Sequence, residues 1–217
     1  MLVLAIDTST PDLVTGLVNT ATGDTVDRPL PGTRAHNEQL TPTVQALLID
    51  ARVTFADIDA IVVGCGPGPF TGLRVGMASA QAFGDALGIP VYGVCSLDAI
   101  AQRLPAGRSL VATDARRREI YWATYIDGQR THGPEVIAPA ELVLPHEVDV
   151  ASVPAALSAA VEVDVDKHDL VPDAASLVAV ADLSADPAPV VPLYLRRPDA
   201  KEPKPRPQSP AIPQVEL

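Results

Sequence analysis

The residues best suited to chemistry gather around a glycine-rich loop. The stretch GCGPGPFTGLRVG runs from Gly64 to Gly76, directly after a short apolar run. Backbone N–H groups of such a loop, at the start of a helix, can hold a phosphate group. Thr71 can cap that helix, and Asp7 ends an earlier apolar run where it can face a phosphate or a metal ion. These residue types fit a nucleotide site, but they also fit a tight turn that only packs a helix.

Standard nucleotide-binding and hydrolase motifs are absent from the sequence. A P-loop needs a lysine after its second glycine, and the first lysine is Lys167. The dinucleotide-binding pattern G-x-G-x-x-G fails because Pro69 or Thr71 stands where the third glycine is needed. Neither G-x-S-x-G nor H-E-x-x-H occurs. Each absence excludes a mechanism that requires those atoms at that spacing.

The other polar residues each have a structural alternative to a functional role. Asp7 can cap the turn made by residues 8–10 instead of facing a ligand. His36 and Glu38 can bind a ligand together, or they can be solvated groups that begin a helix. The run Arg116–Arg118 can touch RNA or ATP, but a solvated hairpin turn is the simpler explanation.

Composition and charge bound the function. A chain of 217 residues that is 47% hydrophobic can build one large or two small domains. Its net charge of −11 disfavours a nucleic-acid-binding surface of its own. Cys65 and Cys95 do not form a disulfide framework, and we expect buried, neighbouring thiols. The sequence has no signal peptide and no apolar stretch of about 20 residues, so we expect a reduced cytoplasmic protein without membrane contact.

Apolar periodicity predicts a mixed sheet with helical crossovers in the first half of the chain. Apolar runs predict strands at residues 2–6, 13–19, 25–30, 58–64 and 91–95. Helical spacing predicts helices at residues 38–52 and 73–87. This order joins an antiparallel meander to parallel crossover units.

A second unit begins near Ile100. Its expected elements are strands at residues 110–113, 119–126 and 190–195 and a helix at residues 173–183. Residues 134–172 have no clear pattern. Beyond Pro198 the stretch KEPKPRPQSPAIP cannot bury a core, so a disordered tail is expected, with a docking peptide as the alternative.

Small residues form a stripe along the helix expected after the glycine-rich loop. They recur every four positions, at Gly72, Gly76, Ala80, Gly84 and Gly88. Each internal glycine costs a helix roughly 1 kcal/mol relative to alanine, so a close contact must compensate. That contact is either with a partner or with the chain's own sheet.

Several segments together resemble the TsaB (YeaZ) family. They are LAIDTST at 4–10, HNEQLTP at 36–42, the whole of 57–101, DARRREIYWA at 114–123 and PLYLRRP at 192–198. The likeness is strong over about the first 125 residues and thin in the last third. Pro69 stands where this family more often has serine.

The resemblance implies an α/β fold of the ASKHA (actin/Hsp70-like) class, with two lobes each built on a mixed β-sheet with flanking helices. The first lobe would span residues 1–99, the second, reduced lobe 100–197, and a Pro-rich tail 198–217. TsaD-type relatives bind a metal with two histidines four positions apart. Ser96 and Ile100 stand at those positions here, so no metal, no cofactor and no catalysis are expected.

The implied role is a non-catalytic scaffold that binds TsaD, joined by TsaE, in threonylcarbamoyl transfer to the tRNA adenosine beside the anticodon. Contact with tRNA would be indirect, through the complex, and a homodimer is an option when TsaD is absent. The family's heterodimers pack through first-lobe helices. This implies an interface at Leu40, Val44, Leu47, Leu73, Gly76, Ala80, Phe83, Gly84 and Leu87.

Two alternatives remain beside the scaffold role. A vestigial nucleotide site would use Asp7, Thr8, Gly66, Gly68 and Thr71. An active enzyme, either an ASKHA-type phosphotransferase or a metallopeptidase-like protein, would use the same loop.

Overall fold

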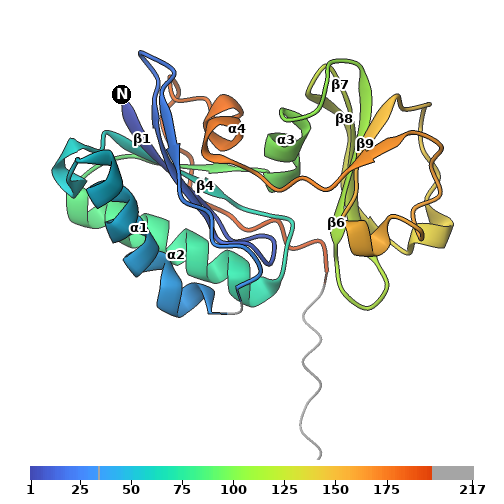
Figure 1. Cartoon of the computed structure of the whole chain (residues 1–217), viewed down its shortest axis with the longest axis horizontal. Coiled ribbons are helices and arrows are strands. Elements are labelled where there is room, and N and C mark those ends of the chain that lie inside the picture. Colours follow the sequence, from blue (N-terminus) through green and yellow to red (C-terminus); the bar gives the residue numbers. More distant parts are fainter. Residues whose placement is uncertain (34, 197–217) are drawn as a thin grey trace, which may run out of the picture.

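Each half of the chain forms a five-stranded mixed sheet, as the computed structural model shows (Figure 1). The structure describes residues 1–33 and 35–196. The first sheet contains β1 (Leu2–Asp7), β2 (Val14–Asn19), β3 (Thr25–Asp27), β4 (Ala60–Gly64) and β5 (Val91–Val94). The second contains β6 (Arg108–Asp114), β7 (Ile120–Ile126), β8 (Gln129–Ile137), β9 (Val150–Ser152) and β10 (Asp166–His168).

The two sheets repeat one topology. The first has the order β3-β2-β1-β4-β5, in which β1 is antiparallel to β2 and parallel to β4. The second has the order β10-β9-β6-β7-β8, in which β6 is antiparallel to β7 and parallel to β9. Each sheet is thus a three-stranded meander extended by two parallel strands. This duplication confirms the expected actin/Hsp70-like fold class.

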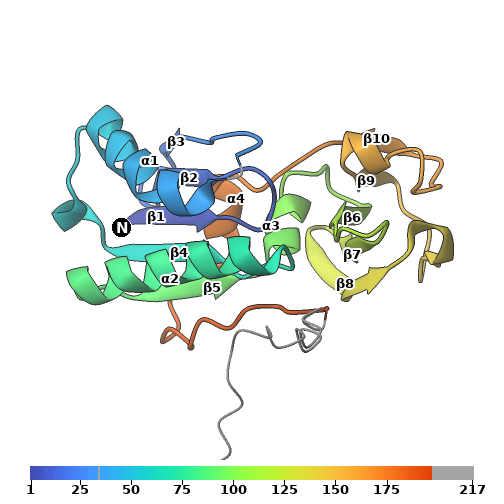
Figure 2. The same cartoon turned by 90° about the horizontal axis from the view of Figure 1, so that it is seen from below.

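Helices cover both faces of the first sheet. The long helices α1 (His36–Ala51) and α2 (Phe70–Leu87) lie on one face, and the short α4 (Ala174–Ala179) lies on the other (Figures 1 and 2). Helix α3 (Ser96–Ala101) lies between the lobes. The remaining helical segments are single 3₁₀ turns at Phe55–Asp57, Pro139–Glu141 and Ala155–Leu157. No helix in the described ranges has the length and apolar character needed to span a bilayer.

Burial explains why the central strands read as unbroken apolar runs. On one face of the first sheet, Leu4, Ile6 and Ile61 pack with residues of α1 and α2. On the other face, Val3 and Val62 pack with residues of α4. A strand buried on both faces needs apolar side chains at every position.

Three element predictions differ from the structure, and one stretch without a prediction contains strands. The strand expected at 25–30 ends at Asp27, and only an isolated bridge joins Leu30 to Leu13. Residues 190–195 form no strand, although the Leu193 N–H donates to the Cys65 carbonyl at 2.9 Å. The helix expected at 173–183 is α4, which is shorter. Three strands lie wholly or partly within 134–172, which had no assignment.

The placement of α4 and the N-cap of α2 also differ from the expectations. Helix α4 falls in the range expected to be the second lobe, yet it packs on the first sheet. Pro69, not Thr71, is the N-cap of α2, and it provides no side-chain cap. The serine usual in the family could accept a hydrogen bond there, whereas proline cannot. The predicted tail at 198–217 lies outside the described residues.

Candidate functional site

Asp7 lies at the end of β1 and is completely buried beneath the glycine-rich loop. Its Oδ1 accepts from the Ser9 backbone N–H at 2.7 Å and from the Ser9 hydroxyl at 2.6 Å. Its Oδ2 accepts from the Ser96 hydroxyl at 2.5 Å. Burial raises the pKa of Asp7, although the hydrogen bonds from Ser9 and Ser96 oppose that shift. The carboxyl group therefore joins β1 to α3 inside the protein.

Close packing at Gly64 makes room for this carboxyl group. A Cβ atom on Gly64 would lie 1.7 Å from Oδ2 of Asp7 and 2.7 Å from Oγ of Ser96. Any larger residue there would displace Asp7. The glycine thus serves an internal hydrogen-bond network and leaves no opening for a ligand at Asp7.

Ser96 and Ile100, which the resemblance places where TsaD-type relatives would have metal-binding histidines, are interior residues. Ser96 is 1% exposed, and its Oγ accepts from the Gly66 N–H at 3.2 Å while donating to Asp7. Ile100 is fully buried and packs with Val111 and Tyr125. Within residues 1–33 and 35–196, no cluster of three or more His, Cys, Asp or Glu side chains could hold a metal ion. The residues present do not fit the metal site of TsaD-type relatives.

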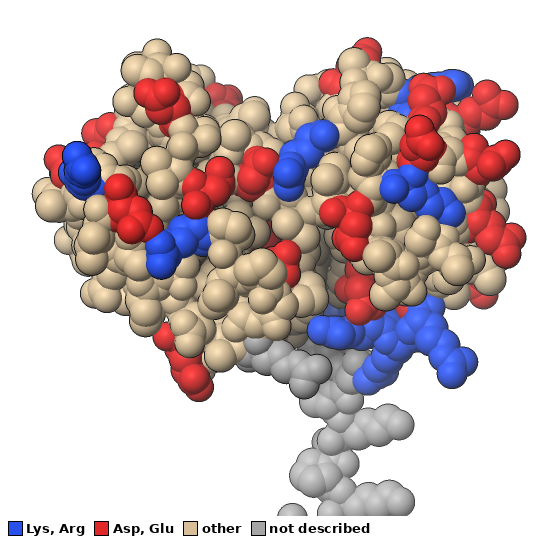
Figure 3. Space-filling model, in the orientation of Figure 1, with Lys and Arg blue, Asp and Glu red and all other residues tan. Residues whose placement is uncertain are grey.

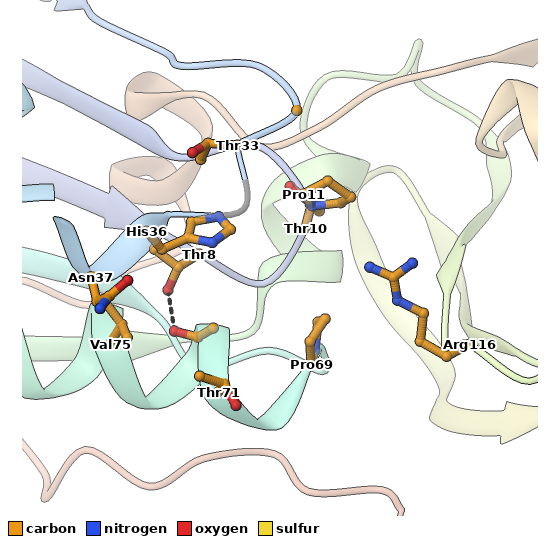
Figure 4. Close-up of a pocket in the computed structure, with 12 residues that line it drawn as sticks. Thr8, Thr10, Pro11, Thr33, His36, Asn37, Pro69, Thr71, Val75 and Arg116 are labelled. Atoms are coloured by element: carbon orange, nitrogen blue, oxygen red, sulfur yellow. Dashed lines mark hydrogen bonds between the residues drawn. The ribbon is translucent and has the colours of Figure 1, made fainter. Parts of the chain in front are cut away.

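A polar cavity of about 410 Å³ lies beside the starts of α1 and α2 (Figure 4). First-lobe residues line most of it, among them Thr8, His36 and Thr71, and Arg116 extends toward it from the second lobe. The Thr8 hydroxyl donates to the Gly72 carbonyl at 2.8 Å (dashed in Figure 4). The lining combines hydroxyl groups with a guanidinium and an imidazole, which are suited to a small polar or anionic ligand.

The predicted nucleotide residues separate into two groups. Thr8 and Thr71 line the cavity, whereas Asp7, Gly66 and Gly68 do not. Gly68 packs against the backbone of Ser9, since a Cβ atom there would lie 2.4 Å from the Ser9 carbonyl oxygen. Of these five residues only Thr71 is exposed at the cavity, because the Thr8 side chain is buried with its hydroxyl bonded to Gly72.

The predicted pair His36 and Glu38 is also separated. His36 lines the cavity, and its Nε2 atom is buried without a hydrogen-bond partner in the described part of the chain. Glu38 is exposed and is not among the lining residues. The sequence did not predict that His36 lines a cavity without Glu38. The residues around His36 do not show that α1 begins beside Thr8, which is far away in the sequence.

The small-residue stripe of α2 faces the chain's own sheet. A Cβ atom on Gly72 would lie 2.5 Å from the Thr8 carbonyl oxygen, and one on Gly76 would lie 2.3 Å from the Thr8 Oγ1. Likewise, a Cβ atom on Gly84 would lie 2.3 Å from Val91 Cγ2. The glycines thus let α2 approach β1 and β5 closely.

Most of the predicted interface residues are buried within this chain, so they are not exposed to a partner in the isolated protein. The buried ones are Leu40, Val44, Leu47, Leu73, Gly76, Ala80 and Gly84. The leucines and valine of α1 pack in the core of the first sheet, and on α2 the small-residue stripe shares the buried side with Leu73. Phe83 and Leu87 are only partly buried, and the Phe83 ring lies 5.5 Å from that of Phe55.

The outward side of the same helices carries a second apolar surface. Ile49 of α1 is 74% exposed, and α2 presents Ala78, Ala82 and Ala86 to solvent at four-residue spacing. The same periodicity that revealed the glycine stripe could have found these alanines. We call Ile49 and the three alanines the outer helix face.

Both cysteines are free, and they line one cavity of about 560 Å³ beside β5 and the segment after α4. Burial raises the pKa of Cys65 to about 11 and that of Cys95 to about 12. The prediction that the two thiols are neighbours agrees with this shared cavity. Cys65 is buried and Cys95 is partly buried, and their raised pKa values make both thiols poor nucleophiles.

Comparison with known proteins gives consistent relatives. The family model described as TsaD, tRNA N6-adenosine threonylcarbamoyltransferase, matches residues 28–184. An uncharacterized protein of Mycobacterium tuberculosis is 56% identical over 92% of this chain and 93% of its own length. The Escherichia coli tRNA threonylcarbamoyladenosine biosynthesis protein TsaB is 36% identical over 68% of this chain and 65% of its own length. The solved structure of YeaZ from Pseudomonas aeruginosa aligns with a TM-score of 0.72 at 30% identity, covering 82% of this chain and 89% of that one.

Proposed function

The chain belongs to the TsaD-related family and, within it, to the TsaB (YeaZ) group, and from that premise we propose that it is the non-catalytic subunit that binds TsaD. The group takes part in the biosynthesis of threonylcarbamoyladenosine in tRNA. In our proposal this chain supports transfer of the threonylcarbamoyl group to the adenosine beside the anticodon without performing the reaction.

The observation that carries this proposal is the interior at Asp7, Ser96 and Ile100. A catalytic carboxylate or metal ligand must reach the substrate or the ion, but these three side chains are packed away from solvent. The Ser96 hydroxyl donates a hydrogen bond to Asp7, and the isoleucine side chain at position 100 has no atom that can bind a metal ion. Burial of these three side chains supports a role in binding over a role in catalysis at this position.

The outer helix face is the surface that we assign to TsaD. Contact residues must be exposed in the free chain, and Ile49 is the most exposed large apolar residue on the two long helices. The three alanines of α2 give a smooth surface on which a partner helix can pack closely. Phe83 and Leu87, which are half-buried at one end of α2, extend this surface.

The remaining partners follow from the same proposal. TsaE joins the heterodimer, and the complex works in the cytoplasm, where its tRNA substrate is. Because the outer helix face stays uncovered when TsaD is absent, two copies of this chain can pair through it. Light scattering at several concentrations measures that state.

The test is to place a charge on the outer helix face. Ile49→Arg and Ala82→Arg should each weaken binding to the cognate TsaD by about 30-fold or more, because burying an unpaired charge costs about 2 kcal/mol or more. Isothermal titration calorimetry with purified TsaD gives the dissociation constant. Val143→Arg is a matched control, since Val143 is a β-branched residue that is 80% exposed in the second lobe.

These variants separate the outcomes clearly. The proposal holds if both helix variants lose affinity and Val143→Arg does not. Equal affinity of Ile49→Arg, Ala82→Arg and the unmodified chain would show that TsaD binds elsewhere.

An active phosphotransferase or metallopeptidase-like enzyme is the second candidate, and the cavity beside Thr8 and Thr71 is the observation in its favour. Metal analysis of the isolated chain and titration with ATP test it. Stoichiometric metal, or ATP binding in the micromolar range that Thr71→Val abolishes, would support the enzyme over the scaffold.

A further inference from the structure

The segment after α4 runs from the first lobe to the second. It comprises residues 183–196, which contain no helix or strand and pass alongside β5 (orange-red in Figure 2). Pro187, Pro189 and Pro192 fall within it, and proline has no N–H group to donate to a neighbouring strand. The segment therefore lies beside the sheet without joining it. We call residues 183–196 the strap.

The end of the strap is held to the first lobe by backbone and side-chain contacts. The Leu193 N–H donates to the Cys65 carbonyl at 2.9 Å. The Tyr194 ring stacks on Phe70 with centroids 4.1 Å apart, and the Tyr194 hydroxyl accepts from Nε of Arg74 at 3.2 Å. Arg74 also lies over the Phe70 ring, 4.1 Å from its centroid. Tyr194 is thus fixed to two residues of α2.

The next two residues of the strap contact the second lobe. Leu195 packs against the apolar cluster that contains Ala115 and Tyr121. Arg196 forms an ion pair with Glu119, in the turn between β6 and β7. Adjacent residues of the strap are therefore fixed to different lobes.

The strap is a third connection between the lobes. Before it, the chain crosses between them twice, once through α3 and once at residues 169–173. The strap lies on the other side of α3 from the crossing at 169–173 (Figure 2), and a notch separates the lobes at the upper edge of the molecule (Figure 3). Two crossings leave the lobes free to rotate as a hinge, and a third connection restrains that rotation.

The strap also holds the turn that carries Arg116. Glu119, which pairs with Arg196, donates its backbone N–H to the Arg116 carbonyl at 3.0 Å. Arg116 lines the polar cavity beside the starts of α1 and α2, although it belongs to the second lobe. The lining of that cavity therefore depends on how the lobes are held.

The position of the strap can be read from Cys65. Val191 and Leu193 line the cavity that Cys65 shares with Cys95, and Cys65 is only 4% exposed. Within the described residues, the strap has a single backbone–backbone hydrogen bond to the first lobe, the one from Leu193 to Cys65. A segment that is held mainly by side chains opens at a lower cost than a strand held by a ladder of hydrogen bonds.

We propose that the strap is a clasp that holds the two lobes closed and opens locally, with Tyr194 as its main anchor. When the clasp opens, the angle between the lobes changes, Arg116 moves away from the polar cavity, and Cys65 becomes accessible. This device does not depend on which partner the chain binds, so it is independent of the proposed function.

Thiol labelling of the full chain measures the opening. In a Cys95→Ala background Cys65 is the only thiol, and its labelling rate at fixed pH follows the fraction of open molecules. Tyr194→Ala should raise that rate about tenfold or more, because it removes the ring pair and the hydrogen bond from Arg74. Tyr194→Phe keeps the ring pair, so its labelling rate should stay within about twofold of that of the unmodified strap.

Further variants locate the effect in the clasp. Arg196→Gln and Glu119→Gln should each raise the labelling rate about twofold, and the double variant should raise it no further, because both remove one ion pair. Ile126→Ala is the matched control, since Ile126 is 42% exposed, compared with 38% for Tyr194, and ends β7 of the second sheet. Its labelling rate should not change.

A distance between the lobes tests whether they move when the strap opens. Spin labels at Val26→Cys in β3 and Gln129→Cys in β8, in a Cys65→Ala/Cys95→Ala chain, place one exposed probe on each sheet. The distribution of distances between the labels should be narrow with Tyr194 and clearly broader with Tyr194→Ala.

Three results would overturn the clasp. The first is an unchanged labelling rate of Cys65 in Tyr194→Ala. The second is faster labelling with an unchanged distance distribution, because the strap would then cover Cys65 without holding the lobes. The third is a labelling rate that depends on urea as steeply as global unfolding does, because Cys65 would then be exposed only when the whole protein unfolds.

Discussion

Asp7 is a buried carboxyl group at a position where the sequence suggested a ligand contact. It stands at the end of the central strand of the first lobe, next to the glycine-rich loop, where the sequence suggested a phosphate or metal contact. In the structure its oxygens are occupied by Ser9 and Ser96. The carboxyl group is therefore a structural link, and its titration can show this.

Replacing Asp7 with asparagine should stabilise the protein, and more so at high pH. Burial raises the pKa of Asp7 in the folded state, so its contribution to stability is full below the unfolded-state pKa and is lost as pH rises through the folded-state pKa. Asparagine does not titrate and can still accept from Ser9. Urea denaturation should give Asp7→Asn a free energy of unfolding that gains on the unmodified chain between pH 5 and pH 8.5 (about the accessible range).

Asp7→Ala provides the control for this measurement. It removes the acceptor for Ser9 and Ser96 and should cost about 2–3 kcal/mol, because buried donors are left unpaired. If Asp7→Asn instead lost stability increasingly as pH rose, the charged carboxylate would have a cationic partner and the structural interpretation would be wrong.

Cys65 and Cys95 should be almost unreactive in the native protein. With pKa values of about 11 and about 12, only a minute fraction of either thiol is ionised near pH 8. Labelling by a disulfide reagent should be about 10³-fold slower than for a free cysteine and should become fast in denaturant. Rapid labelling of either thiol in the folded chain would contradict the burial described for it.

At the scale of elements, the sequence predicted where α2 lies in the chain but not which neighbour its small-residue stripe contacts. Its position and its small-residue stripe could be predicted from four-residue spacing alone. The sequence could not predict what covers the stripe. Close approach to β1 and close approach to a partner helix need the same glycines. The deciding contact, between Gly72 and Thr8, joins residues 64 positions apart.

Gly72→Ala should therefore destabilise the isolated chain. The new Cβ atom would lie 2.5 Å from the Thr8 carbonyl oxygen, which is backbone and cannot turn aside. The expected loss is about 1–3 kcal/mol in urea denaturation, even though alanine favours a helix. Ala82→Leu, on the outer helix face, should change stability by no more than about 0.5 kcal/mol.

The opposite result would contradict the packing of the glycine stripe against the sheet. If Gly72→Ala were as stable as the unmodified chain while Ala82→Leu unfolded it, the glycine side of α2 would face away from the sheet.

Other elements show which structural features can be predicted from neighbouring residues alone. The unbroken apolar runs of β1 and β4 were predicted within two residues because burial on both faces leaves a mark at every position. Residues 190–195 have the same apolar character but form no strand. Strand formation there depends on a free sheet edge, which the local sequence does not specify.

At the scale of the whole molecule, the chain contains two copies of one sheet topology, and a cavity beside the first sheet is lined also by Arg116 of the second lobe. The duplication could not be predicted from periodicity, because β9 and β10 have only three residues each and lie in a long, mostly irregular stretch after β8. The family resemblance supplied it. Buried residues at positions 96 and 100 and the exposed outer helix face are the two features on which the proposed role as a binding subunit rests.

The most direct test of that account is the rate of threonylcarbamoyl transfer to tRNA by the cognate TsaD, measured at rising concentrations of this chain. We expect no turnover by the chain alone and saturating stimulation of TsaD by the unmodified chain. Ile49→Arg should reach the same maximal rate only at about 30-fold or more higher concentration, because it weakens binding by about 2 kcal/mol or more and changes nothing else. Turnover by the lone chain, or full stimulation by Ile49→Arg at the concentration of the unmodified chain, would contradict the account.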